Sequence, residues 1–294
     1  RDAVKNGFEL VVEGPRAQEA QAIAQDLLDR LEFWTRIDDW VRLTLRDGDT
    51  FLEVGANGKG DIVHLSRMPT LEMFRWTDER DEFIDPARAF YWTDQLYAAS
   101  DTPPQSAVFF AEWQMIQASW DSDEGSRYGR PLLTSARKAY KRMTEGEFDI
   151  AIRRKTRAGM KYVHALEDAS EAEVEAYRNR NRAALDDPFA AVTDFFSNKR
   201  TAVTALQGDA NLSDIEDVVH HIRTFFLASP VPMSILGYGQ DLNRDVLDEQ
   251  EEQYRRALEQ VSEWVTGQFV RPLLERQWLL KGIWPDSLTW QAEW

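Results

Sequence analysis

The chain has 294 residues, with 35 Lys or Arg and 51 Asp or Glu, so its net charge is −16. Proteins that grip DNA tightly are usually basic, because cationic side chains displace the counterions condensed on phosphate. The charge therefore argues against a repressor or a nuclease. Because there is no cysteine, disulfides and thiolate metal sites are excluded.

Hydrophobic residues make up 43% of the chain, which is enough to bury a core, and charged residues make up 29%. This composition does not favour intrinsic disorder. At this length we expect one extended domain or two to three sub-domains. The chain starts at Arg1 rather than Met, so we expect it to be part of a longer protein. No apolar run has the length of a membrane span, and no membrane partner is predicted.

The first predicted element is a helix over residues 14–46. Apolar residues recur there at three- and four-residue spacing, which places them on one helix face. They are Ala20, Ile23, Ala24, Leu27, Leu28, Leu31 and Trp34. After residue 46 the pattern changes to short β-type runs separated by turn-forming residues. We therefore predict a small antiparallel β region, with strands at 51–54, 62–65, 71–76, 89–92 and 107–110.

Helices dominate the second half of the chain. A long helix is predicted over 131–158, followed by a β run over 160–166. The next helix, 170–185, begins with the capping-box pair Ser170 and Glu173.

A second capping-box pattern opens a helix over 213–228. The longest helical segment covers 244–281, and we expect it to bend near Gly267 or Pro272 because proline removes a backbone hydrogen bond. The predicted fold class is α+β and mainly α-helical, with the small antiparallel β region described above.

Four stretches, in this order along the chain, together resemble the portal proteins of tailed double-stranded DNA bacteriophages. They are Tyr128-Gly129-Arg130-Pro131-Leu132-Leu133, continued by 136–141; the run from Asp149 to Ala158; the run from Gly208 to Val218, with Pro230-Val231-Pro232 after it; and Phe269-Val270-Arg271-Pro272-Leu273-Leu274, continued to Ile283. The similarity covers about residues 128–284. Residues 1–127 match only in general character.

The resemblance implies an elongated subunit, built of wing, stem and clip, in a closed ring. It divides the chain into 1–127 as the wing, 128–158 as the first stem helix, 159–211 as the clip, 212–229 as the second stem helix, 230–243 as the tunnel-loop region, and 244–294 as the long helix with the return to the wing or crown.

Portal proteins assemble into rings, usually of twelve copies, at one capsid vertex, and DNA is packaged and ejected through the ring. The resemblance therefore implies a homo-oligomer, expected to be a dodecamer, through which double-stranded DNA passes. The other implied partners are the terminase large subunit, the major capsid or scaffolding protein, and a head-completion or tail adaptor protein. It implies no catalytic activity and no cofactor. The implied location is the virion, after assembly in the host cytoplasm.

The resemblance also places a tunnel loop, which faces the DNA channel. Its residues are Leu236, Gly237, Tyr238, Gly239, Gln240, Asp241, Leu242, Asn243 and Arg244. Acids in and just after the loop fit a channel wall that repels DNA and lets it slide. They also fit a helix N-terminus, where the macrodipole favours negative charge, and the two interpretations are compatible.

One part of this acidic chain is basic. Between Arg130 and Lys161 there are ten basic residues and three acidic ones. Such a segment fits an acidic face of its own chain or of the next subunit, or DNA phosphate, and the plain alternative is a solvated helix face. The basic residues expected at the junction of stem and clip are Arg153, Arg154, Lys155, Arg157 and Lys161.

Two other classes of function stay open. Eleven tryptophans suit packing in a core or an interface, but also a ligand-stacking surface. The alternative function is therefore a Trp-rich carbohydrate-binding structural module of a virion or cell surface. A metal-dependent nuclease that uses the many carboxylates is the second rival, but no recognisable ligand spacing supports it. The run from Asp241 to Glu252 matches a calcium loop only in part, since Val246 stands where the turn needs glycine. No metal site and no catalytic residue are predicted.

Overall fold

The structure is a computed structural model. It describes residues 2–4, 7–94, 102–123, 126–157, 163–166, 169–185, 195–197, 216–236 and 243–294. The chain divides into two compact units, each with its own contacts. The main unit consists of Arg1–Ser135 and Ala228–Trp294, and the inserted unit consists of Ala136–Leu227.

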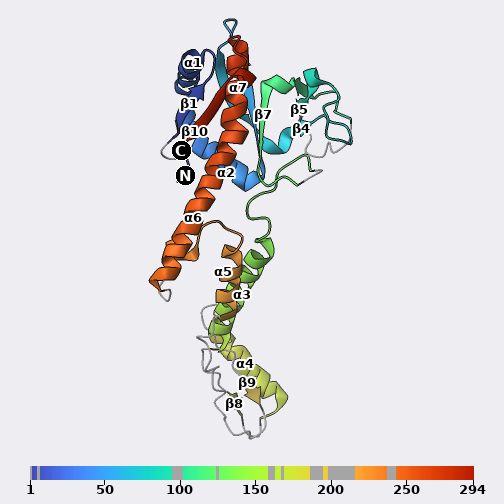
Figure 1. The fold of residues 1–294 in the computed structure, drawn as a ribbon. Helices are drawn as coiled ribbons and strands as arrows, with labels where there is room; N and C mark the ends of the chain where they lie inside the picture. The colour runs from blue at the N-terminus through green and yellow to red at the C-terminus, as the bar shows by residue number, and fades with distance from the viewer. Residues whose placement is uncertain are drawn as a thin grey trace. The chain divides into compact units, whose positions relative to one another are not determined.

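The main unit begins and ends with strands that pair with each other (Figure 1). In chain order its helices and strands are β1 (Glu9–Glu13), α1 (Ala17–Arg30), α2 (Phe33–Asp47), β2 (Asp49–Ala56), β3 (Ile62–Met68), β4 (Met73–Arg75), β5 (Phe90–Trp92), β6 (Val108–Phe110), β7 (Met115–Ser119), α6 (Arg244–Val265), α7 (Arg271–Leu280) and β10 (Thr289–Glu293). The fold is therefore mixed helix and sheet, as predicted. None of the described helices combines the length and the apolar character needed to cross a membrane.

The single helix predicted over 14–46 is wrong, because the structure has two helices there. The chain turns at Glu32, whose φ of 49° lies in the left-handed region. Leu31 and Phe33 are both buried. In one continuous helix they would point about 200° apart. The turn lets both side chains enter the same core, and this burial outweighs the local preference for an unbroken helix.

The predicted antiparallel β region is present as two three-stranded sheets, with the strand orders β3-β2-β7 and β4-β5-β6. Side chains alternate between the two faces of β2. Leu52 and Val54 belong to the larger hydrophobic core. Phe51 packs in a second cluster with residues of the other sheet, such as Phe90 and Phe110. Strand β2 thus has an apolar layer on each side, which explains why its first six residues are almost all buried.

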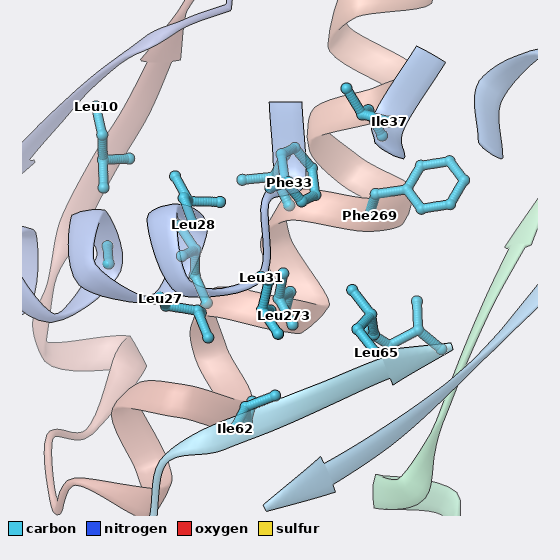
Figure 2. Close-up of a cluster of buried hydrophobic side chains, with 14 of the residues drawn as sticks. Leu10, Leu27, Leu28, Leu31, Phe33, Ile37, Ile62, Leu65, Phe269 and Leu273 are labelled. Carbon is cyan, nitrogen blue, oxygen red and sulfur yellow. The ribbon is translucent and has the colours of Figure 1, made fainter. Parts of the chain in front are cut away.

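The larger core lies between helices α1, α2 and α7 and the sheet that contains β2 and β3. Figure 2 shows Leu27, Leu28 and Phe33 on one side of this core and Ile62 and Leu65 on the other. Fully burying one such side chain contributes about 1.5–3 kcal/mol. This core gives the main unit its stability.

Two polar side chains of α7 fix its position against distant parts of the main unit. The Trp278 indole donates to the backbone oxygen of Ala20 at 2.9 Å. The Gln277 amide accepts from the backbone N–H of Ile62 at 2.9 Å and donates to the oxygen of Gly60 at 2.8 Å. Helix α7 is thereby joined to α1 and to the start of β3.

Between α6 and α7, where the sequence predicts a bend near Gly267 or Pro272, the structure has a π-helical turn, Thr266–Val270. Pro272 stands in the first turn of α7 and has no N–H to donate to the preceding turn. The Trp294 indole donates to the Thr266 hydroxyl at 2.7 Å. The turn is thus held by the C-terminal strand region of the main unit.

The inserted unit contains α3 (Arg137–Arg157), β8 (Val163–Ala165), α4 (Glu171–Leu185), β9 (Phe195–Ser197) and α5 (Glu216–Phe226). Strands β8 and β9 form a parallel pair. The capping box predicted at the start of α4 is confirmed: the backbone N–H of Glu173 donates to the Ser170 hydroxyl, and the Glu173 carboxylate accepts from the backbone N–H of Ser170. The capping pattern at Ser213 lies outside the described residues.

Candidate functional site

Within the main unit, one buried carboxylate helps to hold the segment that precedes α3. Asp49 accepts from the Ser119 hydroxyl at 2.6 Å, the Gln117 amide at 3.0 Å and the backbone N–H of Gly129 at 2.9 Å. Only 3% of Asp49 is exposed. A buried carboxylate is stable when several donors satisfy it. Asp49 therefore joins β2, β7 and the lead-in of α3.

Two glycines let this lead-in approach the end of α2. A Cβ atom on Gly129 would lie 2.3 Å from the backbone oxygen of Gly48, and one on Gly48 would lie 2.6 Å from that of Gly129. Gly48 also has a φ of +94°, which favours glycine. The backbone N–H of Arg130 then donates to the oxygen of Trp120 at 2.7 Å. The run that starts at Tyr128, which carries part of the resemblance to portal proteins, is thus held by contacts with the end of α2 and with Trp120.

Helices α3 and α5 of the inserted unit lie side by side (Figure 1). They run antiparallel, because Tyr140 contacts Phe225 while Gly146, further along α3, faces Val218, earlier in α5. A Cβ atom on Gly146 would lie 3.1 Å from a methyl group of Val218. Small residues allow this close approach: Ala139 on α3 and Ala136, just before its first residue, are both buried.

The opposite face of α3 is exposed. Phe148 is 66% exposed, and Ile152 on the same face is also exposed. The cations of the first two turns are exposed as well, and they are Arg137, Lys138, Lys141 and Arg142. Among the described contacts, only Lys141 has a carboxylate neighbour, Glu145, at 3.8 Å.

The basic residues expected at the junction of stem and clip are placed only in part. Arg153, Arg154, Lys155 and Arg157 lie in the last turns of α3. Their side chains, and the whole of Lys161, lie outside the described part of the chain. Their role stays a prediction.

The predicted tunnel loop is described only at its two ends. Leu236 closes a 3₁₀ segment, Met233–Leu236, and is half exposed. Gly237, Tyr238, Gly239, Gln240, Asp241 and Leu242 lie outside the described residues. The Ser234 hydroxyl donates to the Gln250 amide oxygen at 2.6 Å, which joins the 3₁₀ segment to α6.

Asn243 and Arg244 begin α6. The Asn243 side chain accepts from the backbone N–H of Val246 at 3.0 Å and is the N-cap, so the loop ends in a fixed helix start. Sequence reasoning placed Asn243 in the loop and missed this role, although Asn is a preferred N-cap residue. Arg244 is exposed, 3.9 Å from the carboxylate of Asp248.

Acidic residues gather on the first turns of α6. Gln250 faces the 3₁₀ segment, and a spacing of about 100° per residue places Asp245, Asp248 and Glu252 on the opposite side and Glu249 at the edge. All four are exposed. Glu252 pairs with Arg256 at 3.2 Å. Within the described ranges, no three Asp, Glu or His side chains come together in a way that could hold a metal ion.

The aromatic side chains of the second sheet pack mainly on each other. Phe74 stacks on Tyr91 at 5.3 Å between ring centroids, and Phe109 lies 6.0 Å from Tyr91 and 5.7 Å from Trp76. Burial raises the pKa of the Tyr91 hydroxyl above its usual value. Because Tyr91 is 4% exposed, its ring offers no free platform to a sugar.

The fold can be compared with known proteins. No protein-family model matches the sequence, and no curated protein matches it. Among solved structures, a chain from the virion of a native gene transfer agent particle matches with a TM-score of 0.59 at 11% sequence identity. The match covers 98% of this chain and 76% of that chain. The two chains share a fold. At this identity the likeness establishes the fold alone.

Proposed function

We propose that the chain is a portal protein: one subunit of a ring at a capsid vertex, through which double-stranded DNA enters and leaves. The observation that carries the proposal is the fold shared with a virion component over nearly the whole chain. The ordered motifs between residues 128 and 284 support it independently. The antiparallel helices α3 and α5, with an exposed outer face, are consistent with a stem.

The proposed assembly is a dodecamer in which geometry, and no reactive group, performs the task. The ring binds the terminase large subunit during packaging and a head-completion or tail adaptor protein afterwards. Its rim contacts the major capsid or scaffolding protein. In this proposal α3 and α5 belong to the stem, residues 159–211 form the clip, and the start of α6 follows the tunnel loop.

The test is a packaging experiment with particles that lack this chain. Particles assembled without it are expected to stay empty, and supplying the full-length protein is expected to restore DNA filling. Filled particles in the absence of the chain would contradict the proposal. Tryptophan fluorescence titrated with glycans tests the carbohydrate-binding alternative, which requires saturable quenching or enhancement.

A further inference from the structure

The face of α3 that points away from α5 combines apolar and basic side chains. At about 100° per residue, Arg137, Lys141 and Phe148 lie opposite Gly146, which faces α5. Phe148 and Ile152 are exposed side by side on this face. Neighbouring exposed apolar residues with a polar rim are typical of a surface that another protein covers.

Within the described part of the chain, the cations at the start of α3 have few carboxylate neighbours. No carboxylate in the described part of the chain pairs with Arg137, Lys138 or Arg142, and Lys141 has only the distant Glu145. The helix macrodipole places partial positive charge at this end, so cations are unfavourable there. A negatively charged surface that docks here would supply carboxylate partners for these cations and would offset their unfavourable interaction with the macrodipole.

Such a surface exists on the same chain. The start of α6 carries Asp245, Asp248, Glu249 and Glu252, all exposed. Arg256 pairs with Glu252, and Arg244 lies near Asp248, but the described residues provide no cation for Asp245 or Glu249. Acids are favoured at this end of a helix, so the face stays negative.

We propose that the basic start of α3 in one copy docks on the acidic start of α6 in the adjacent copy. The inference rests on the proposed function, because it requires neighbouring copies in a ring. The two faces are different and complementary, so the contact is head-to-tail, and a head-to-tail contact closes into a ring when the rotation fits. DNA phosphate is the weaker candidate for the basic face, since the chain's net charge of −16 repels DNA.

The experiment uses two charge-reversal variants of the full-length protein. The first carries Arg137→Glu, Lys138→Glu and Lys141→Glu; the second carries Asp245→Lys, Asp248→Lys and Glu249→Lys. Each variant alone places like charges at every contact, so the fraction of protein in rings is expected to fall at least about tenfold. Mixed in equal amounts, the variants pair alternately with restored attraction, and rings are expected to return to within about twofold of the wild-type level.

The mixture separates a contact between copies from one within a chain, because an internal contact stays broken in both variants. A control with Arg42→Glu, Lys59→Glu and Arg80→Glu makes the same change in net charge at other exposed positions and is expected to assemble normally. Circular dichroism confirms that each variant folds.

Three results overturn the inference: variants that assemble alone, a mixture that does not recover, or a control that fails like the first variant. Loss of DNA binding with normal rings would assign the basic face to phosphate and also overturn it. If the wild-type protein forms no ring at all, the proposed function itself fails.

Discussion

At the scale of single residues, the polar side chains that matter most join segments far apart in the sequence. Asp49 stands at the start of β2 and holds Ser119 and Gly129, 70 and 80 residues further on. Gln277 accepts from Ile62 across 215 residues. Sequence reasoning had no signal for either side chain, because one acid beside a strand and one amide in a helix are common. Only the tertiary fold assigns their roles.

We expect Asp49→Ala to lower the free energy of unfolding by about 2–4 kcal/mol, because it removes a buried acceptor shared by three part-buried donors and leaves the Ser119 hydroxyl and the Gly129 N–H without it. Urea denaturation measures the change. Asp29→Ala, which removes an exposed carboxylate, is the control and is expected to change stability by about 0.5 kcal/mol or less. Equal effects of the two substitutions would contradict the role given to Asp49.

The Asp61 carboxylate gives a pH-dependent prediction. A hydrogen bond from the Lys281 ammonium, at 2.5 Å, and one from the Asn57 amide hold the pKa of Asp61 below its usual value. A carboxyl whose pKa is lowered by folding stabilises the fold above its unfolded pKa, about 3.9, and this contribution is lost as pH falls through the folded value.

Asp61→Asn is therefore expected to destabilise the protein at pH 7, and the difference from wild type is expected to shrink below about pH 4. Urea denaturation over a pH series measures it. A difference that stays constant down to pH 2 would contradict the assigned cause.

At the scale of elements, patterns among neighbouring residues predicted the local structure, but the pairing of segments far apart in the sequence was not predicted. The capping box at Ser170 was predicted correctly, because it depends on residues within one turn. Strands β1 and β10 were not paired in the prediction, since Glu9 meets Glu293 from the other end of the chain. A short strand depends on its neighbours more than on its own propensity.

The same contrast between local patterns and long-range packing holds for the candidate site. The excess of basic residues in α3 is visible in the sequence, and so are the acids of α6. Which side of α3 faces outward depends on where α5 packs, and that is fixed by the approach of Gly146 to Val218. The predicted helix start at 131 is also wrong, because α3 begins at Arg137. The backbone N–H of Leu132 donates to the backbone oxygen of Leu45, and residues 132–136 form turns before the helix.

Substitutions of two helical glycines test the α3–α5 contact. Gly146 lies in that contact, and Gly267, which lies elsewhere, serves as the comparison. A Cβ atom on Gly267 meets nothing within 4 Å, so Gly267→Ala is expected to stabilise the protein by up to about 1 kcal/mol through helix propensity. Gly146→Val forces branched methyl groups against Val218 and is expected to destabilise the inserted unit by about 1–3 kcal/mol. Thermal unfolding followed by circular dichroism compares the two. A neutral Gly146→Val variant would contradict the close helix contact.

At the scale of the whole molecule, the chain has a well-packed main unit and an inserted unit with much exposed charge and apolar surface. A monomer gains nothing from an exposed Phe148, or from cations at a helix start for which the described residues supply few carboxylates. Both features are explained if neighbouring copies cover them. The proposed function leads to the same expectation.

The basic residues at the end of α3 are tested in the assembled particle. Arg153→Glu, Lys155→Glu and Arg157→Glu together are expected to hinder ring assembly or terminase docking, because they reverse the charge that the partner meets. Particle yield and packaged DNA are measured side by side. Normal rings and normal packaging with all three reversals would show that this segment is only a solvated surface.

The central claim is that copies of this chain close around an axial hole. The most direct test is the native mass of the purified full-length protein, together with electron microscopy of the same sample. We predict a closed ring with one discrete mass, expected at twelve copies, and a central opening wide enough for a DNA duplex. A protein that stays monomeric at every concentration and salt condition tested would contradict the account.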